Sequence, residues 1–256
     1  MVGAHGRRVL GVFPHPDDEA WAAGALLARC AQAGAAVHLV CATRGEAGSD
    51  REGRAAAGPE LAALRTTELA CSAAALGCAP PRFLDLPDGA VTTTPAAVEA
   101  LAAEVTAVRP DLVITLGDDG GYGHRDHLAT TALVDLALAT AGASPRVLHA
   151  VFPRGLFAPV HGRLSCSARG RSLLGEVAGE ALGVDARAVQ LVVEVGPLRA
   201  AKLAALAAHR SQLPDGDPMR FLHPGLVTPL LEREWFRVAG GPALPSGATD
   251  PFAGLA

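Results

Sequence analysis

Two hydrophobic patterns take turns along the first part of the chain. Short apolar runs predict strands, and longer segments with apolar residues at every third or fourth position predict helices. The predicted strands cover residues 9–13, 37–42, 82–86, 111–116 and 147–152. The predicted helices cover residues 20–30, 61–76, 95–108 and 128–139. This alternation predicts an α/β fold with a mostly parallel sheet that is covered on both faces.

The pattern is less regular beyond residue 152. Residues 190–195 predict a further strand and residues 198–208 a further helix, whereas residues 153–188 carry no pattern that we can interpret. Residues 240–256 are rich in Gly, Pro and Ala and predict a loose tail. We therefore expect a single α/β domain over residues 1–239, followed by this tail.

A polar segment directly follows the first predicted strand and consists of His15, Pro16, Asp17, Asp18 and Glu19. Pro16 restricts His15 to an extended conformation and suits the first position of a helix. The three acidic residues would then occupy the first helical turn, where free backbone N–H groups favour negative charge. Because acidic residues are common at helix starts, this segment alone does not establish a site.

A second polar cluster follows the strand predicted at residues 111–116. It contains His124, Asp126 and His127 in a glycine-rich segment, which by itself is also typical of a surface loop. In an open α/β sheet, however, ligands bind at the carboxyl ends of the strands. Both clusters stand at such ends, so we expect them to form one site.

Three side chains from the two clusters suit a catalytic metal. His15, Asp18 and His127 would give zinc three ligands and leave a fourth position for water. A metal of this kind lowers the pKa of water towards about 7 and stabilises the oxyanion that forms when water attacks an amide. Asp17 is adjacent to a ligand and remains free to accept the proton of this water. The set therefore predicts metal-assisted hydrolysis with Asp17 as general base.

The two clusters resemble the His-Pro-Asp-Asp-Glu and His-x-Asp-His motifs of the LmbE-like, or PIG-L-like, zinc deacetylases, which remove N-acetyl groups from glucosamine-containing compounds. Residues 43–48, 65–69 and 209–212 are similar to further segments of that family, so the resemblance spans residues 8–213. It implies one zinc ion per chain and the general-base role for Asp17. The expected fold is a Rossmann-like three-layer sandwich with its active site at the carboxyl ends of the strands.

The second cluster supplies further catalytic candidates. His124 lies three residues before His127 and can point at the same centre, where it would act as an acid or electrophile. Asp126 would orient or charge His124, as carboxylates commonly do for catalytic imidazoles. The resemblance implies these same roles. The sequence leaves open whether Asp17 or His124 protonates the leaving amine.

Tyr122 is the only tyrosine of the chain and stands between two glycines. On a mobile loop, its hydroxyl would polarise the acyl carbonyl or assist the leaving amine, as the resemblance also implies. The alternative is a loop aromatic without a chemical role.

Candidates for substrate binding lie further from the two clusters. Arg65, Asp88 and His209 would reach a polyhydroxyl substrate if their segments fold over the strand ends, and Arg44 and Glu46 are weaker candidates. Each of the first three also has a structural alternative. Arg65 suits an ion pair along a helix, Asp88 a turn, and His209 the end of a helix.

Composition limits the class of protein. The 256 residues are 50% hydrophobic and 19% charged, which suffices for one sizeable core. A net charge of −4, the lack of a basic patch and 4% aromatic residues argue against nucleic acid as a partner. Only a short apolar run follows Arg7 and Arg8, so we expect no signal peptide, and no stretch is long enough to span a membrane.

The five cysteines form no C-x-x-C pair. This favours a reducing cytoplasm, in which most of these side chains act as small buried hydrophobes.

We expect hydrolysis of an N-acyl group, in the first place acetyl, from an amino sugar within a small molecule. The resemblance implies glucosaminyl-inositol thiol precursors, antibiotic intermediates or chitin fragments as substrates. Lys202 is the only lysine among many arginines and alanines, which suggests a GC-rich bacterial genome and favours the first two. A homo-oligomer and a divalent metal other than zinc remain open.

Two alternative functions use the same residues. An amidase that cleaves a thiol conjugate would differ in the products that it releases. A noncatalytic α/β module would use the polar groups to bind a sugar or nucleotide, and Asp17→Asn would leave its function intact, whereas an enzyme would lose turnover. No G-x-G-x-x-G follows the first strand, which argues against a dinucleotide-binding oxidoreductase.

Overall fold

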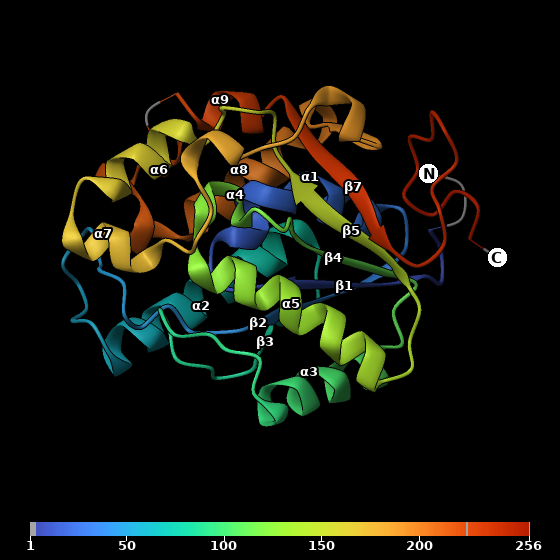
Figure 1. The fold of residues 1–256 in the computed structure, drawn as a ribbon, viewed down its shortest axis with the longest axis horizontal. Helices are drawn as coiled ribbons and strands as arrows, with labels where there is room; N and C mark the ends of the chain where they lie inside the picture. The colour runs from blue at the N-terminus through green and yellow to red at the C-terminus, as the bar shows by residue number, and fades with distance from the viewer. Residues whose placement is uncertain (1–3, 224, 256) are drawn as a thin grey trace.

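The computed structural model describes residues 4–223 and 225–255. Its centre is a seven-stranded sheet with the strand order β3-β2-β1-β4-β5-β7-β6 (Figure 1). The strands are β1 (Arg8–Phe13), β2 (Ala36–Cys41), β3 (Arg82–Phe83), β4 (Leu112–Leu116), β5 (Arg146–Val151), β6 (Leu191–Glu194) and β7 (Arg233–Gly240). Strands β1 to β5 are parallel, and β7 is antiparallel to its neighbours β5 and β6. The mostly parallel sheet predicted from the sequence is confirmed.

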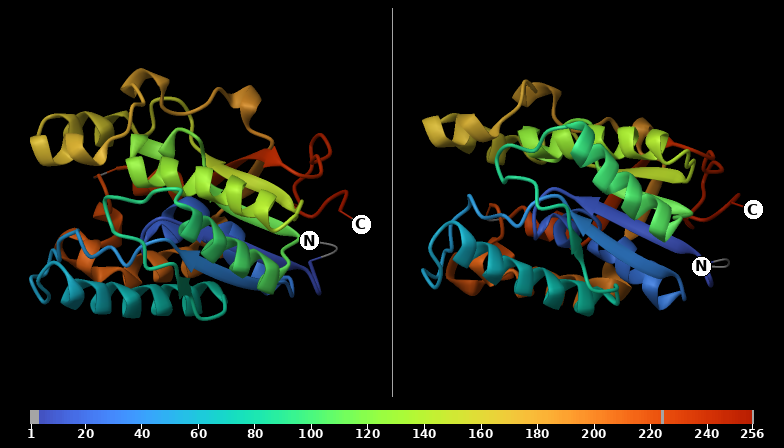
Figure 2. Two further views of the ribbon diagram at one scale, coloured as in Figure 1. Left: turned by 60° about the horizontal axis from the view of Figure 1, so that its bottom comes forward. Right: turned by 90° about the horizontal axis from the view of Figure 1, so that it is seen from below.

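Helices cover both faces of the sheet (Figure 2). They are α1 (Asp18–Gln32), α2 (Pro59–Leu76), α3 (Pro95–Val108), α4 (Gly120–Gly123), α5 (Arg125–Thr140), α6 (Ala158–Ser165), α7 (Ala168–Leu173), α8 (Arg199–Ala208) and α9 (Val227–Leu230). Short 3-10 helices occupy Gly179–Ala181, Ala186–Ala188, Gly196–Leu198, Arg210–Gln212, Pro214–Gly216 and Pro218–Arg220. Within the described part of the chain, no helix combines the length and the apolar character needed to cross a membrane.

The alternation of side chains along β1 explains why both faces are buried. Leu10 and Val12 pack into one apolar core with α3 and α5, whereas Val9 and Phe13 pack into the other core with α1 and α8. Successive strand residues point to opposite faces, so a strand between two helical layers is apolar throughout.

The predicted elements lie within three residues of the observed ones, and α3 has the predicted bounds. Strand β7 was not predicted, because Arg233, Glu234 and Arg237 interrupt its apolar residues. The Glu234 carboxylate is nevertheless buried, since it pairs with Nζ of Lys202 at 2.5 Å. Because a buried position of β7 carries a charged side chain, the strand lacks the apolar pattern by which the other strands were predicted.

Helix α1 begins at Asp18, and Pro16 therefore does not occupy its first position, contrary to the prediction. Asp17 precedes the helix with φ 137° and ψ −26°, a conformation that residues other than glycine rarely adopt. Local backbone preference does not favour this turn, and the turn instead makes contacts with Arg65 and Glu19.

Residues 153–188 carry α6, α7 and two of the 3-10 helices. They are tied to the segment between β4 and α5 by two hydrogen bonds. Gly175 N donates to Gly123 O at 2.7 Å, and Gly183 N donates to Oδ2 of Asp119 at 2.8 Å. The segment without a sequence pattern thus holds the loop that carries the second polar cluster.

Residues 241–255 are anchored on the core by a few buried side chains rather than loose, in contrast to the prediction. Leu244 and Phe252 are buried in the core that contains α1. The buried Arg146 side chain donates hydrogen bonds to the carbonyl oxygens of Pro242, Ala243 and Pro251. The Gly and Pro content indicated correctly that regular secondary structure ends after β7. It did not indicate that the irregular segment packs on the core that contains α1. The division into a domain over residues 1–239 and a tail stays a prediction.

The cysteines depart in part from expectation. Cys30 and Cys41 are buried, but Cys71 and Cys166 are exposed. The prediction that most of the five side chains are buried is therefore wrong.

Candidate active site

The two polar clusters meet at the carboxyl ends of β1 and β4, which are neighbours in the sheet. His15 follows β1, His124 caps the N-terminus of α5, and His127 lies in the first turn of that helix. All three imidazoles are buried, and one ring nitrogen of each lies within 4.8 Å of the others. The structure thus brings His15 together with two nitrogen donors from a distant part of the sequence.

The Asp18 carboxylate bridges two of these histidines. Its Oδ2 lies 3.2 Å from Nδ1 of His15, and its Oδ1 lies 3.5 Å from Nε2 of His127. Trp21 Nε1 donates to Oδ1 at 3.1 Å and fixes the carboxylate further. Burial opposes the charge of Asp18, but the two imidazoles outweigh burial and lower its pKa.

His127 presents a nitrogen that suits a metal. Its Nδ1 lies 2.9 Å from Gly120 O, so Nδ1 carries the hydrogen and Nε2 keeps its lone pair. Nε2 is buried and has no hydrogen-bond partner among the described residues. Burial lowers the pKa of His127 to about 4, so the ring stays neutral. A neutral imidazole beside a carboxylate is the donor chemistry that zinc prefers, so these residues fit the metal.

Two further carboxylates contact the His15 ring at Nε2, on the side opposite to Asp18. Nε2 of His15 lies 3.2 Å from Oδ1 of Asp88 and 3.2 Å from Oδ2 of Asp126. Burial would lower the pKa of His15, but hydrogen bonds with Asp126, Asp18 and Asp88 raise it well above 6.5. With Nε2–H donated to these carboxylates, Nδ1 faces Asp18. Such an arrangement is typical of a metal-binding histidine.

Asp126 therefore has a different partner from the one predicted. Its carboxylate accepts hydrogen bonds from Gly89 N at 2.7 Å and Val91 N at 3.2 Å, in addition to its contact with His15. The hydrogen bond between Asp126 and His124 involves the backbone of Asp126, whose N–H donates to Nδ1 of His124 at 3.2 Å. The prediction that the Asp126 carboxylate orients His124 is wrong, because the start of α5 turns it towards β1.

His124 is a neutral hydrogen-bond donor. Since Nδ1 accepts a backbone hydrogen bond, the ring hydrogen lies on Nε2. Burial lowers the pKa of His124 well below 6.5, and His127, His15 and Arg125 add to this effect. The side chain lines a cleft, where Nε2–H is able to donate to a bound molecule.

Asp17 lines the same cleft and pairs with Arg65, whose Nη2 lies 3.2 Å from Oδ2 of Asp17. Burial raises the pKa of Asp17 to about 7, although Arg65 opposes this shift. A carboxylate with a pKa near neutrality is able both to accept a proton as a general base and to donate it as a general acid.

Tyr122 packs against the aromatic rings of the site. It lies within the short helix α4, and its ring centroid is 5.0 Å from that of His127 and 5.8 Å from that of His124. Burial and the nearby carboxylates of Asp18 and Asp17 raise the pKa of its hydroxyl well above 10. The hydroxyl therefore stays protonated at the edge of the cleft.

The candidate substrate-binding residues do not line the cleft. Arg65 and His209 are buried, Arg65 against Asp17 and His209 against Glu19, with 2.7 Å between His209 Nε2 and Glu19 Oε1. Asp88 contacts His15 and accepts a hydrogen bond from Ala47 N. The side chains of Arg65, Asp88 and His209 thus point towards these partners rather than into the cleft.

The weaker candidates, Arg44 and Glu46, line a separate hollow and contact Asp85 and Asp88.

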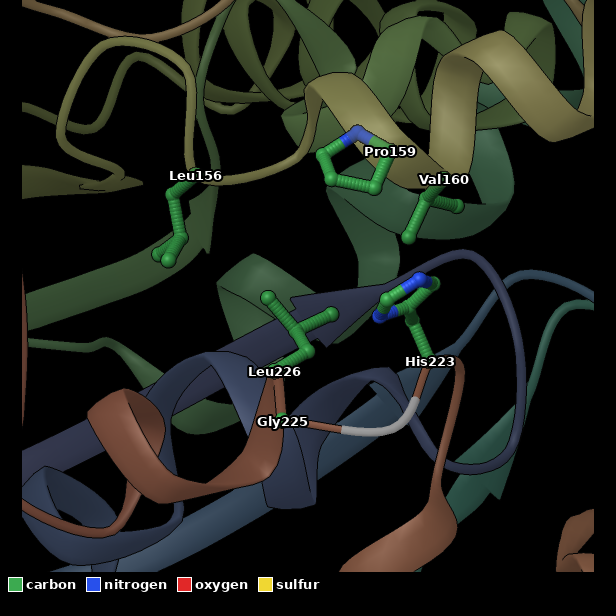
Figure 3. A pocket seen from close by; sticks show the side chains of 6 residues that line it. All are labelled: Leu156, Pro159, Val160, His223, Gly225 and Leu226. Carbon is green, nitrogen blue, oxygen red and sulfur yellow. The ribbon is translucent and has the colours of Figure 1, made fainter.

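Sequence reasoning missed the far wall of the cleft. The cleft has a volume of about 210 Å³ and, besides Asp17, Tyr122 and His124, is lined by Arg51, Val160, Arg163, Leu164, Leu173, Gln212, Phe221 and Leu222. Four of these residues belong to α6 and α7, in the segment without a sequence pattern. Figure 3 shows a second, apolar hollow of about 270 Å³, lined by Leu156, Pro159, Val160, His223, Gly225 and Leu226. It shares only Val160 with the cleft.

The sheet order and a histidine–carboxylate site at the carboxyl ends of β1 and β4 define a Rossmann-like α/β protein with a metal-type site. Residues 10–138 match the family model described as PIG-L: GlcNAc-PI de-N-acetylase. The chain belongs to this family of metal-dependent N-deacetylases, which act on amide bonds.

Individual relatives agree with this assignment. A 1D-myo-inositol 2-acetamido-2-deoxy-alpha-D-glucopyranoside deacetylase of Nakamurella multipartita is 35% identical over 271 residues, covering 94% of this chain and 92% of the relative. Among solved structures, the N,N'-diacetylchitobiose deacetylase from Pyrococcus horikoshii has a TM-score of 0.65 at 24% identity, covering 91% of this chain and 83% of that one.

The fold alone does not determine the reaction. A 4-carboxy-2-hydroxymuconate hydratase from Pseudomonas putida has a TM-score of 0.63 at 18% identity, covering 94% of this chain and 100% of that one. The reaction must therefore be argued from the site.

Proposed function

We propose that this protein is a zinc-dependent hydrolase that removes the acetyl group from an N-acetylglucosaminyl-inositol or a closely related amino-sugar conjugate. The position of Asp18 carries the proposal. Its two oxygens lie 3.2 Å from Nδ1 of His15 and 3.5 Å from Nε2 of His127, and that Nε2 is buried without a hydrogen-bond partner among the described residues. A buried nitrogen lone pair facing a buried carboxylate is unfavourable unless a cation lies between them.

We assign His15, Asp18 and His127 as the residues that hold the metal. When bound there, zinc supplies an acidified water molecule and a Lewis acid for the acyl oxygen. One ion per chain matches this single set. Another divalent metal remains compatible with nitrogen and oxygen ligands.

The chain itself supplies the proton transfers. Asp17, with its pKa near 7, accepts a proton from the attacking water. His124 donates Nε2–H to the oxygen of the acyl group, because its Nδ1 is already engaged by the backbone. The Tyr122 hydroxyl, which stays protonated, is a second donor from the same wall. Since His124 acts as a neutral donor, Asp17 is the group that returns the proton to the leaving amine.

The choice of substrate is supported by the extent of similarity to the Nakamurella relative, which covers nearly the full length of both chains. The far wall of the cleft would contact the part of the substrate beyond the acetyl group. It offers Arg51, Arg163 and Gln212 for hydroxyl groups, and apolar side chains from α6 and α7. A small-molecule substrate is in keeping with a cleft of about 210 Å³. A cytoplasmic location and a homo-oligomer stay predictions.

Release of primary amine tests the proposal. Protein stripped with a chelator and the same protein restored with zinc would be given N-acetylglucosaminyl-inositol, N,N'-diacetylchitobiose and a thiol conjugate of glucosaminyl-inositol. We expect zinc-dependent release, fastest from N-acetylglucosaminyl-inositol. Faster cleavage of the thiol conjugate would instead indicate the amidase. Binding of the sugars without release would indicate the noncatalytic module.

Asp17→Asn provides the matched variant, because it keeps the size of the side chain and removes its basicity. We expect turnover to fall by about 10²–10⁴-fold while one zinc per chain is retained. Full activity of this variant would refute the general-base assignment.

A further inference from the structure

The peptide unit between Pro16 and Asp17 is held at both of its polar atoms. Nη2 of Arg65 donates to Pro16 O at 2.6 Å, and Asp17 N donates to Oε2 of Glu19 at 3.0 Å. This peptide precedes a residue with φ 137°, which L-amino acids other than glycine rarely adopt. A strained backbone of this kind persists only where surrounding contacts enforce it.

Glu19 is itself fixed from the other side. Its Oε1 accepts hydrogen bonds from Oγ of Ser72 at 2.5 Å and from Nε2 of His209 at 2.7 Å. Glu19, Ser72 and His209 are all buried, with exposed fractions of 1%, 0% and 0%. Both carboxylate oxygens therefore have partners, and the acceptor of the Asp17 N–H group has a defined position.

Arg65 is fixed in a similar way. Its Nη1 donates to Gly45 O at 3.1 Å, and a Cβ atom at position 45 would overlap the guanidinium group. Gly45 also has a φ of +69°, so two constraints require glycine there. The buried guanidinium thus contacts Gly45, Pro16 and Asp17 at the same time.

We propose that Arg65, Glu19, Ser72 and His209 form a clamp that holds Asp17 in its strained backbone conformation and so aims its carboxylate at the cleft. These four are positioning residues, and the proposal rests on the general-base role of Asp17 proposed above. The clamp gives a role to the segments 43–48, 65–69 and 209–212, none of which contributes a metal ligand in the assignment above. It also explains why Arg65 and His209 lie beside the site without lining the cleft.

The neighbouring pair of Ser211 and Glu68 offers a matched control. Ser211 N donates to Oε1 of Glu68 at 2.7 Å and Ser211 Oγ donates to Oε2 at 2.6 Å. The pair is buried, joins the same two segments as the clamp, and makes no described contact with Asp17 or Glu19. Ser211→Ala therefore removes a comparable hydrogen bond to Glu68, together with the one that Ser211 Oγ accepts from Nε2 of Gln212 at 2.9 Å, without acting on the strained peptide.

The first experiment compares kcat, KM and zinc content of the zinc-loaded variants His209→Leu, His209→Gln and Ser211→Ala. In His209→Leu we expect kcat to fall by about 10–100-fold, since a small displacement of a catalytic group has effects of this order. KM should stay within about threefold and zinc content should be unchanged, because the substrate wall and the ligands are untouched. His209→Gln should recover part of kcat, because its amide can donate to Glu19. A loss in His209→Leu no greater than in Ser211→Ala, or one that parallels loss of zinc, would overturn the clamp.

The second experiment does not depend on activity. Asp17→Ala and Asp17→Gly are compared by urea unfolding, each introduced both into the wild-type chain and into the His209→Leu variant. If the clamp enforces a positive φ, the Gly variant unfolds at higher urea than the Ala variant in the wild-type chain, and the difference shrinks in the His209→Leu background. Equal differences in both backgrounds would show that His209 does not hold the strained turn. If the wild-type protein had no deacetylase activity, the proposed function would be refuted. The comparison of unfolding in the two backgrounds would still show whether the clamp exists.

Discussion

The carboxylate of Asp126 lies 3.2 Å from Nε2 of His15, although 111 positions separate the two residues in the sequence. Asp126 comes from the first turn of α5, and His15 from the end of β1. The pair joins the two polar clusters and directs Nδ1 of His15 towards Asp18. We therefore expect Asp126 to act on the proposed metal site through His15 rather than on His124.

Asp126→Asn should weaken zinc binding by about 10–100-fold, because the amide removes the negative charge that orients and polarises His15. Competition with a chromophoric chelator measures the affinity. Asp135→Asn, at an exposed position of the same helix, is the control and should leave the affinity unchanged. Equal affinities of the Asp126 variant and the wild type would show that this carboxylate does not support the metal site.

His124→Ala should retain zinc and lose activity. The Nδ1 atom of His124 accepts a hydrogen bond from the backbone, and in our assignment its Nε2–H donates to the substrate. We expect kcat to fall by about 10²–10⁴-fold at an unchanged zinc content. His127→Ala, by contrast, should lose the metal. If His124→Ala also lost zinc, the ligand set would be the three histidines rather than two histidines and Asp18.

The contribution of His209 to stability should depend on pH. Burial alone would lower the pKa of His209, but the Glu19 carboxylate outweighs burial and raises it above 6.5. A raised pKa in the folded state means that the stabilisation is complete below about pH 6.5 and is lost as the pH rises through the folded value. The destabilisation by His209→Gln should therefore be larger at pH 6 than at pH 9. Urea unfolding at both pH values measures it, with Ser211→Ala as the variant whose effect should be the same at both. A constant difference for His209→Gln would contradict an ionised pair with Glu19.

The C-terminal segment should contribute strongly to stability. Phe252 is 3% exposed and packs into the core that contains α1, so Phe252→Ala should lower the free energy of unfolding by about 3 kcal/mol. Leu136→Ala removes a side chain that is 45% exposed and should change it by less than about 0.5 kcal/mol. Chemical denaturation checks both variants. Similar values for the two would mean that the segment after β7 is not docked in solution.

The site could be predicted in part because its position depends on strand ends. His15 lies two residues after β1, and His127 lies in the first helix of regular length after β4; neighbouring parallel strands bring their carboxyl ends together. The partners of the side chains could not be predicted in this way. Only Arg125 separates His124 from Asp126, but the start of α5 at Arg125 turns the Asp126 carboxylate towards His15. Only the packing of α5 on the sheet decides that direction.

The sequence by itself determined the order of strands and helices up to β5, except for the short α4, because each of the other elements carries its own hydrophobic period. It also determined that the two polar clusters share one end of the sheet. Only the tertiary structure decided that Arg65 and His209 face Asp17 and Glu19 rather than the cleft, and that α6 and α7 form the far wall of the cleft. It also decided that β7 inserts between β5 and β6. These outcomes depend on contacts between residues distant in the sequence and on buried ion pairs such as Lys202–Glu234. Local periodicity carries no information about such contacts, since their energy arises only when the layers pack together.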